Sequence, residues 1–460
     1  MLDKIRQVIS RLFKKKDIKD ATGIEVAISE EMSRAIALWA AMYEDKAPWV
    51  DNDKVKSLNL AATIANEIAR LVTLEMRSEV VGNDYLNEQY QRIMKDIRTV
   101  VEYAAAKGGL IFKPYVDGDN IEVDYVQADL FFPTKYDSNG NITGCIFVDR
   151  RKKGNVIYSR LEHHELVEGG YRITNTAYKN TVGDDSLGNK ISLTAVEEWK
   201  DLSPEVFIPD IEKPLYGYFK IPITNNIDTR SPLGCSVYSR AVNLIKEADK
   251  QYSRILWEYE GSELAIDASI DVFKLDSSGK PILPEGKERL FRAYDFDTDK
   301  DGRKPMEVFS PSIRDESLFN GLNRLLQRIE FACGLAYGTL SDMQMVAKTA
   351  TEIKASKQRT YSTISDIQKS LEHALTDLVD AMDVWTRLYG LGSGEEYEVS
   401  FEWDDSLAMD MDTEYNLMLR EVSAGILKPE YYLKRRYGVT DEQLKEMMPE
   451  PFDDGFGDDG

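Results

Sequence analysis

Cysteine and histidine are scarce in this 460-residue chain, which has three of each. The cysteines, Cys145, Cys235 and Cys333, lie far apart and form no CxxC pair, so neither a disulfide scaffold nor a zinc ribbon is expected. The adjacent His163 and His164 would point to opposite faces of a strand and could not chelate one ion together. We expect both to be polar residues of a surface or an interface. Since no signal peptide is evident, a reduced intracellular compartment is expected.

Sequence signals for several kinds of chemistry are also missing. The chain has no GxSxG nucleophile elbow, no GxxxxGK[ST] phosphate loop and no GxGxxG dinucleotide fingerprint. No apolar run approaches the roughly 20 residues that a membrane-spanning helix needs. We therefore expect no catalytic site, no ATPase motor, no cofactor and no membrane span.

The charge of the chain is strongly negative. Lys and Arg number 58 against 80 Asp and Glu, which gives a formal net charge of −22. Such an excess argues against a protein that binds nucleic acid tightly over a broad basic face. It does not argue against a protein along which DNA moves without tight binding. The hydrophobic fraction of 42% is that of a folded protein, and the length allows two or three domains.

The first 19 residues differ from the rest, because seven Lys or Arg surround an apolar stripe that includes Leu2, Ile5 and Ile9. One interpretation is an end helix that lies on the body of the protein with a solvated basic face. The other is a helix that binds a membrane surface or a partner.

The best metal candidate is a run of three carboxylates, Asp297, Asp299 and Asp301, followed by Gly302. Oxygen ligands on alternate residues and a glycine for the sharp turn are typical of the opening of a calcium loop. The bidentate Glu that closes such a loop is missing, because position twelve is Val308. We therefore interpret the run as a solvated acidic turn and expect no metal site.

Hydrophobic periodicity predicts a protein of the α+β class that is predominantly helical. Helical stripes cover about residues 28–39, 60–72 and 90–104. From there to about residue 222 the period changes to two, with turn pairs between short runs, which predicts antiparallel strands.

The second half of the chain has three further helical patterns. They are predicted at 236–261 and 315–336, with a compact α/β insert between them, and at 350–390, where about 40 residues without Gly or Pro give a helix roughly 60 Å long. The remaining chain has one strand at 397–403 and a disordered, acidic, glycine-rich tail. Short helices are predicted around 413–423, 429–437 and 441–447.

Five short runs stand out around these central helices. They are YGYFKIP at 216–222, NN at 225–226, SPLGCS at 231–236, AVNLIKEADKQYS at 241–253 and KTATEI at 348–353. These runs, and the order of the elements over nearly the whole chain, resemble portal proteins of tailed bacteriophages, of the type found in phages of Gram-positive bacteria.

The resemblance implies a portal architecture. Its parts would be a wing at 1–231 (helical, then antiparallel β), stem helices at 236–261 and 315–336, a clip at 263–314, a tunnel loop at 339–348, a long wing spine helix at 350–390, a wing strand at 397–403, and a reduced crown with a disordered tail at 404–460. It also implies a head-to-tail connector subunit in a closed ring, a dodecamer in assembled virions, around a DNA channel.

The resemblance further implies partners and a location. Double-stranded DNA would pass through the channel without sequence specificity, and the major capsid and scaffold proteins would contact the ring. The ring would occupy the portal vertex of the capsid after assembly in the host bacterial cytoplasm. Two alternatives stay open: another virion structural protein, such as a minor capsid or adaptor component, and a metal-dependent nuclease.

Candidate contact residues follow from the same resemblance. In the tunnel loop they are Asp342, Met343, Gln344, Met345 and Lys348. The two methionines can instead pack against neighbouring loops, and the lysine can simply begin the next helix.

In the clip, the candidates for docking are Arg289, Phe291, Arg292 and Tyr294. They would face the terminase large subunit during packaging and the head-completion adaptor afterwards. The alternative is an ordinary strand with a buried Phe and Tyr.

Overall fold

The structure, a computed structural model, divides the chain into two compact units. The larger consists of Met1–Thr73 with Ser78–Phe401, and the smaller of Leu74–Arg77 with Glu402–Gly460. The described residues are 15–51, 54–74, 76–182, 186–283, 290–294, 304–342, 350–392, 394–403, 411–437 and 444. Helices hold 42% and strands 27% of the residues, which confirms the expected α+β class.

Helices dominate the start of the larger unit. After α2 (Lys15–Thr22) come α3 (Glu30–Tyr43), α4 (Leu60–Val72), α5 (Asp84–Met94) and α6 (Ile97–Lys107). The helices predicted over 28–39 and 60–72 are thus confirmed as α3 and α4, apart from small shifts of their ends.

The single helix predicted through residues 90–104 is wrong, because the chain breaks between α5 and α6. Asp96 leaves helical geometry with φ −105° and ψ 7°. The two helices pack on different neighbours: Gln89 of α5 accepts a hydrogen bond from the backbone N–H of Ile121 at 3.2 Å, whereas α6 packs against α4. Apolar spacing continues across the break because both helices bury one face.

The antiparallel region predicted after α6 is confirmed as two sheets. The first has the order β10-β2-β3 and the second the order β4-β5-β6-β7-β8, with β9 also paired to β7. The strands are β2 (Gly109–Asp117), β3 (Asn120–Gln127), β4 (Phe131–Tyr136), β5 (Ile142–Lys153), β6 (Val156–Val167), β7 (Gly170–Thr181), β8 (Asn189–Ile191), β9 (Glu205–Pro209) and β10 (Gly217–Lys220).

A charged cluster is buried between these sheets. The Glu162 carboxylate on β6 lies 2.7 Å from Lys113 Nζ, 3.1 Å from Arg160 Nη2 and 2.8 Å from His164 Nε2. Burial opposes ionisation of Glu162, but Lys113, His164 and Arg160 outweigh it and hold the pKa of this carboxyl well below its usual range. The expectation of a surface or interface role is therefore wrong for His164, which is buried and also contacts the Tyr171 hydroxyl.

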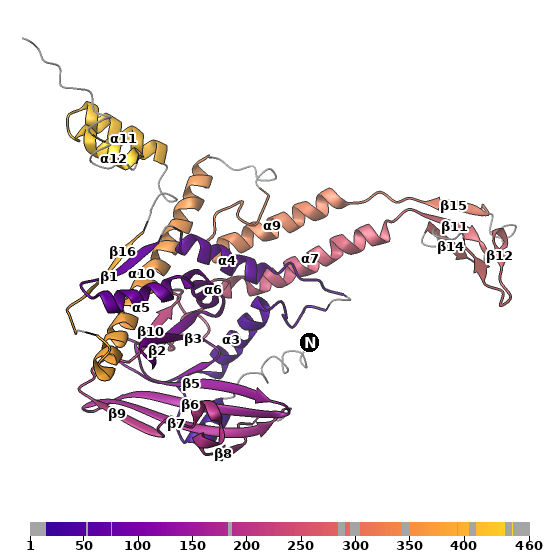
Figure 1. Ribbon diagram of the computed structural model, residues 1–460. Coiled ribbons are helices and arrows are strands. Elements are labelled where there is room, and N and C mark those ends of the chain that lie inside the picture. The colour runs from indigo at the N-terminus through magenta and orange to yellow at the C-terminus, as the bar shows by residue number, and fades with distance from the viewer. Residues whose placement is uncertain are drawn as a thin grey trace, which may run out of the picture. The chain divides into compact units, whose positions relative to one another are not determined.

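The long helix predicted at 350–390 is confirmed as α10 (Ala350–Tyr389). Figure 1 shows it beside the sheet that contains β2 and β10, against which its apolar face packs. The approach is very close at Gly217, where a Cβ would lie 2.2 Å from the Ala374 carbonyl oxygen. Beyond α10, β16 (Glu398–Glu402) pairs with β1 (Arg77–Val81), a strand that sequence periodicity did not predict.

The two helices on either side of the insert are α7 (Val242–Gly261) and α9 (Asp315–Cys333). Helix α7 begins six residues later than predicted, because the Ser236 hydroxyl accepts a hydrogen bond from Tyr238 N–H and the Tyr238 hydroxyl donates to the Trp39 carbonyl in the core. Helix α9 ends at Cys333, three residues earlier than predicted, and the next residue, Gly334, has a φ of +73°, the left-handed conformation that glycine favours.

In the smaller unit, α11 (Met411–Ser423) and α12 (Pro429–Tyr437) confirm two of the short helices predicted there. The Arg436 guanidinium lies 5.2 Å from the centre of the Tyr415 ring and joins the two helices. Of the third predicted helix, at 441–447, only residue 444 lies among the described residues. Throughout the described part of the chain, no helix combines the length and apolarity needed to cross a bilayer.

Candidate functional site

Helices α7 and α9 form an antiparallel pair with the insert at one end, as Figure 1 shows. The side chain of Gln251 donates to the Leu318 carbonyl at 3.3 Å. Nearer the insert, the Arg314 guanidinium makes two hydrogen bonds, of 3.0 and 2.8 Å, to the Glu258 carboxylate. The planar fork of arginine matches a carboxylate, so this contact fixes where the chain enters and leaves the insert.

A buried carboxylate within α7 attaches the pair to the helical layer. Asp249 is 2% exposed, and its two oxygens accept hydrogen bonds from the Trp49 indole at 2.8 Å and from the backbone N–H of Leu58 at 2.9 Å. Burial raises the pKa of Asp249, although both hydrogen bonds oppose that shift. These contacts hold α7 against Trp49 and Leu58.

Large apolar side chains remain exposed along the helix pair. The most exposed is Trp257, at 68%, and Phe331 is 56% exposed. Tyr259 and Phe319 are also exposed on the helices, and Leu264 and Ile313 are exposed where the chain enters and leaves the insert. Such a group of apolar side chains on ordered helices usually marks a surface that contacts another protein.

The insert contains a three-stranded sheet in the order β14-β11-β15 and a two-stranded sheet of β12 and β13. Strand β11 pairs in parallel with β14 and antiparallel with β15. The strands are β11 (Ala265–Ser269), β12 (Lys274–Leu275), β13 (Pro281–Ile282), β14 (Phe291–Tyr294) and β15 (Met306–Phe309).

The predicted docking residues of the insert differ in their surroundings. Arg292 makes hydrogen bonds of 2.7 and 3.1 Å to Asp267, so its charge is neutralised within the sheet. Phe291 is half-buried, whereas Tyr294 is 46% exposed. Arg289 lies outside the described residues, as do Asp297, Asp299 and Asp301 of the acidic turn.

The segment after α9 is anchored by one buried carboxylate. Glu330 is 0% exposed, and its Oε1 accepts hydrogen bonds from the backbone N–H groups of Gly338, Leu340 and Ser341 at 3.1, 2.6 and 2.8 Å. Its Oε2 accepts a fourth from the Ser341 hydroxyl at 2.9 Å. Because backbone amides supply three of the donors, the carboxylate fixes the path of the main chain there.

Two further contacts extend this anchor. Asn323, seven residues before Glu330 on the same face of α9, accepts from Asp342 N–H at 2.8 Å and donates to the Asp342 carbonyl at 3.3 Å. The backbone N–H of Tyr337 donates to the Ser356 hydroxyl of α10 at 2.9 Å. Residues 337–342 are thus attached to both α9 and α10, and we call them the loop base.

The loop base overlaps the start of the predicted tunnel loop. Of the predicted contact residues, Asp342 is exposed at its end, and Met343, Gln344, Met345 and Lys348 lie outside the described residues. Sequence reasoning missed the two anchors in α9. The available signal was two polar side chains, seven residues apart, on the apolar face of a predicted helix.

Comparison with known proteins decides the family. A family model described as phage portal protein, SPP1 Gp6-like, matches residues 10–450. The chain belongs to this portal protein family. Portal proteins of this kind are structural proteins of the phage head-to-tail connection and are not enzymes, which removes the nuclease alternative.

A comparison with solved structures also finds similar chains. One similar chain comes from the neck of a native GTA particle, computed with C12 symmetry. It shares 12% sequence identity with a TM-score of 0.39, over 91% of this chain and 97% of that chain. A comparison with curated proteins finds no match.

In the portal protein, no group of three or more His, Cys, Asp or Glu residues is placed to hold a metal ion within the described ranges. The three cysteines are buried and free. The features described above are the exposed apolar side chains of the helix pair, the exposed residues of the insert, and the anchored loop base.

Proposed function

We propose that this portal protein forms a closed ring, a dodecamer, at one capsid vertex, and that double-stranded DNA passes through it during packaging and ejection. The observation that supports this most directly is the family match over residues 10–450, which spans the helix pair, the insert, the loop base and α10. Membership of the portal protein family gives a portal or connector role. Our proposal adds the closed ring, the number of subunits and the path of the DNA.

In this proposal the elements take the parts of a portal. Helices α7 and α9 form the stem, residues 263–314 the clip and residues 339–348 the tunnel loop. Helix α10 is the spine of the wing, which also includes residues 1–231 and β16. Helices α11 and α12 belong to a reduced crown.

The exposed apolar side chains of the helix pair support ring closure. A head-to-tail contact, repeated by rotation, uses two different patches on each subunit and closes without leaving a free patch. Trp257 on α7 and Phe331 on α9 lie on different helices and would serve the two neighbours. Burying a large aromatic side chain in such a contact contributes about 1.5–3 kcal/mol.

The acidity of the chain suits a channel through which DNA slides. A ring of subunits with a net charge of −22 each would repel phosphates overall and prevent tight binding. Brief contacts would then come from a few residues at the narrowest point, for which Asp342, Met343, Gln344, Met345 and Lys348 are the candidates. The anchor at Glu330 supports this assignment, since a loop that contacts moving DNA needs a fixed root.

We assign the clip to docking, first of the terminase large subunit and then of the head-completion adaptor. Arg289, Phe291, Arg292 and Tyr294 remain the proposed contact residues, and the exposure of Tyr294 supports its part. The exposed Val308 on β15 adds an apolar position to the same sheet. Deleting residues 263–314 should leave the wing folded and abolish packaging, and retained packaging would contradict the assignment.

A substitution on the stem tests ring formation. Trp257→Glu places a charge where the proposal buries an aromatic side chain, so rings should be lost from native mass spectra while the monomer stays folded. Val182→Glu is the matched control, because Val182 is 41% exposed and lies outside the helix pair. Rings of unchanged abundance in Trp257→Glu would exclude Trp257 from the contact.

A further inference from the structure

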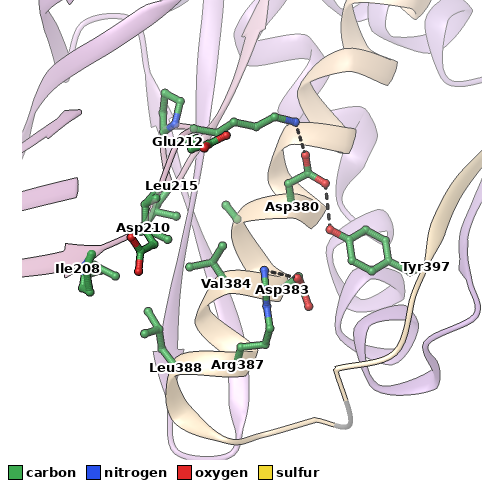
Figure 2. Close-up of a pocket in the computed structure, with 15 residues that line it drawn as sticks. Ile208, Asp210, Glu212, Leu215, Asp380, Asp383, Val384, Arg387, Leu388 and Tyr397 are labelled. Carbon is green, nitrogen blue, oxygen red and sulfur yellow. Dashed lines mark hydrogen bonds and ion pairs between the residues drawn. The ribbon is translucent and has the colours of Figure 1, made fainter. Parts of the chain in front are cut away.

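A pocket of about 570 Å³ lies between the segment that follows β9 and the last turns of α10. Figure 2 shows Ile208 and Leu388 among its apolar lining residues, with carboxylates and two cations around them. The function proposed above makes no use of this pocket. The basic segment at the start of the sequence is likewise unused.

The pocket has four carboxylates and two cations. Lys213 pairs with Asp380 at 2.7 Å, and Arg387 pairs with Asp383 at 2.8 Å. The Tyr397 hydroxyl also donates to Asp380 at 2.9 Å. Both cations are therefore engaged by carboxylates of α10.

The other two carboxylates, Asp210 and Glu212, lie in the segment that follows β9. Neither side chain has an ion-pair or hydrogen-bond partner in the part of the chain that the structure describes. Asp210 has φ +60°, which is uncommon for a residue other than glycine, and its backbone N–H donates to the Gly169 carbonyl. The rim thus has an excess of negative charge above an apolar floor.

Such a pocket suits a basic amphipathic segment. The long aliphatic part of Lys or Arg covers apolar surface while the charged group stays at the rim, where carboxylates attract it. DNA does not fit, because its phosphates would be repelled. An acidic peptide is excluded for the same reason.

We propose that residues 1–14 of this chain dock in the pocket. Their sequence has the required chemistry, since Leu2, Ile5 and Ile9 form an apolar stripe with Lys4 and Arg6 beside it. The first 19 residues contain seven basic and two acidic residues in a chain whose net charge is −22.

The segment is long enough to reach the pocket from its own chain. The carbonyl of Ala21 accepts a hydrogen bond from the Tyr178 hydroxyl of β7, and Ile208 at the pocket pairs with Tyr171 of the same strand. Seven residues of strand span about 23 Å. The stripe requires residues 1–9 to be helical, and with residues 10–14 extended the segment then spans about 30 Å.

A labelled peptide tests the proposal in solution. A fluorescent peptide of residues 1–19 is titrated into the chain lacking residues 1–14, and fluorescence anisotropy should show saturable binding that weakens with added salt. Replacing Asp210→Asn together with Glu212→Gln should weaken binding about five- to tenfold. The matched control is Asp117→Asn with Glu88→Gln, two acidic residues outside the pocket, and should bind as the parent does.

Three results would overturn the proposal. The first is equal binding to the pocket variant and its control, and the second is equal binding of a peptide in which Ile5→Asp and Ile9→Asp break the stripe. The third is a peptide that partitions into vesicles of anionic lipid but does not bind the protein, which would make the segment a membrane-surface helix.

A crosslink tests docking in the full chain. Cysteines introduced by Arg6→Cys and Leu388→Cys should form a disulfide, and the native cysteines do not interfere because all three are buried. A crosslinked monomer would show that the segment docks on its own chain, and a crosslinked ladder that it docks on a neighbouring copy. No crosslink in either form would contradict docking, whether or not the protein forms rings.

Discussion

Replacing Glu330 is the most informative change in the loop base. In Glu330→Ala, the three backbone N–H groups and one hydroxyl that now bind the carboxylate lose their acceptor. The residue is 0% exposed, so water reaches these donors only if the segment opens. We therefore expect residues 337–342 to detach from α9.

The size of the effect follows from the hydrogen bonds. A hydrogen bond to a charged group contributes about 1.5–3 kcal/mol, and a buried donor left without a partner costs about 1–3 kcal/mol. Part of this is offset because the buried charge disappears together with its desolvation cost. We expect Glu330→Ala to lower the free energy of opening of the loop base by about 3–5 kcal/mol.

Glu330→Gln separates shape from charge. The amide oxygen of Gln can still accept from the three backbone N–H groups, and its NH₂ group can donate to the Ser341 hydroxyl. Neutral hydrogen bonds are about half as strong as charged ones, so we expect a loss of about 1–2 kcal/mol. Glu260→Ala, an exposed change on α7, should stay within about 0.5 kcal/mol of the parent.

Hydrogen exchange measures the opening directly. The amides of Gly338, Leu340 and Ser341 should be least protected from exchange in Glu330→Ala, more protected in Glu330→Gln and most protected in the parent. Unchanged protection of these amides in Glu330→Ala would refute the assignment of Glu330 as the anchor.

Two further changes test the core of the wing. Glu162→Gln should lower the free energy of unfolding at pH 7 by about 2–4 kcal/mol, because Lys113 loses its buried partner. The folded-state pKa of Glu162 lies well below 4.5, so its contribution to the free energy of unfolding is fully present above pH 4.5. The difference in that free energy between the parent and Glu162→Gln, measured by urea unfolding, should shrink as pH falls through the folded-state pKa. Gly217→Ala should cost about 2–3 kcal/mol, because its Cβ would meet the Ala374 carbonyl, whereas Gly261→Ala meets nothing within 4 Å and should be nearly neutral.

Local patterns predicted the long elements of the fold. Helix α10 has 40 residues without Gly or Pro and a continuous apolar stripe, so its bounds follow from sequence. The break at Asp96 and the late start of α7 did not, because apolar spacing continues through both. They depend on tertiary contacts such as that of the Tyr238 hydroxyl with the Trp39 carbonyl.

The candidate site was predictable in outline only. The helix pair and the insert follow from periodicity and turn residues, but the anchors do not, because Glu330 and its partners become adjacent only when the chain reverses at Gly334. The burial of His164 was missed for a related reason. Alternation along the strand predicts which face of β6 His164 lies on. It does not predict the contact with the Tyr171 hydroxyl on β7, which covers His164.

The ring is tested most directly by electron microscopy of the purified full-length chain, viewed along the expected symmetry axis. The proposal predicts closed rings of twelve subunits around a central opening wide enough for a DNA duplex, with α7 and α9 of each subunit between those of two neighbours. Particles in which the helix pair contacts no second copy, at concentrations where mass spectrometry finds the chain folded, would contradict it.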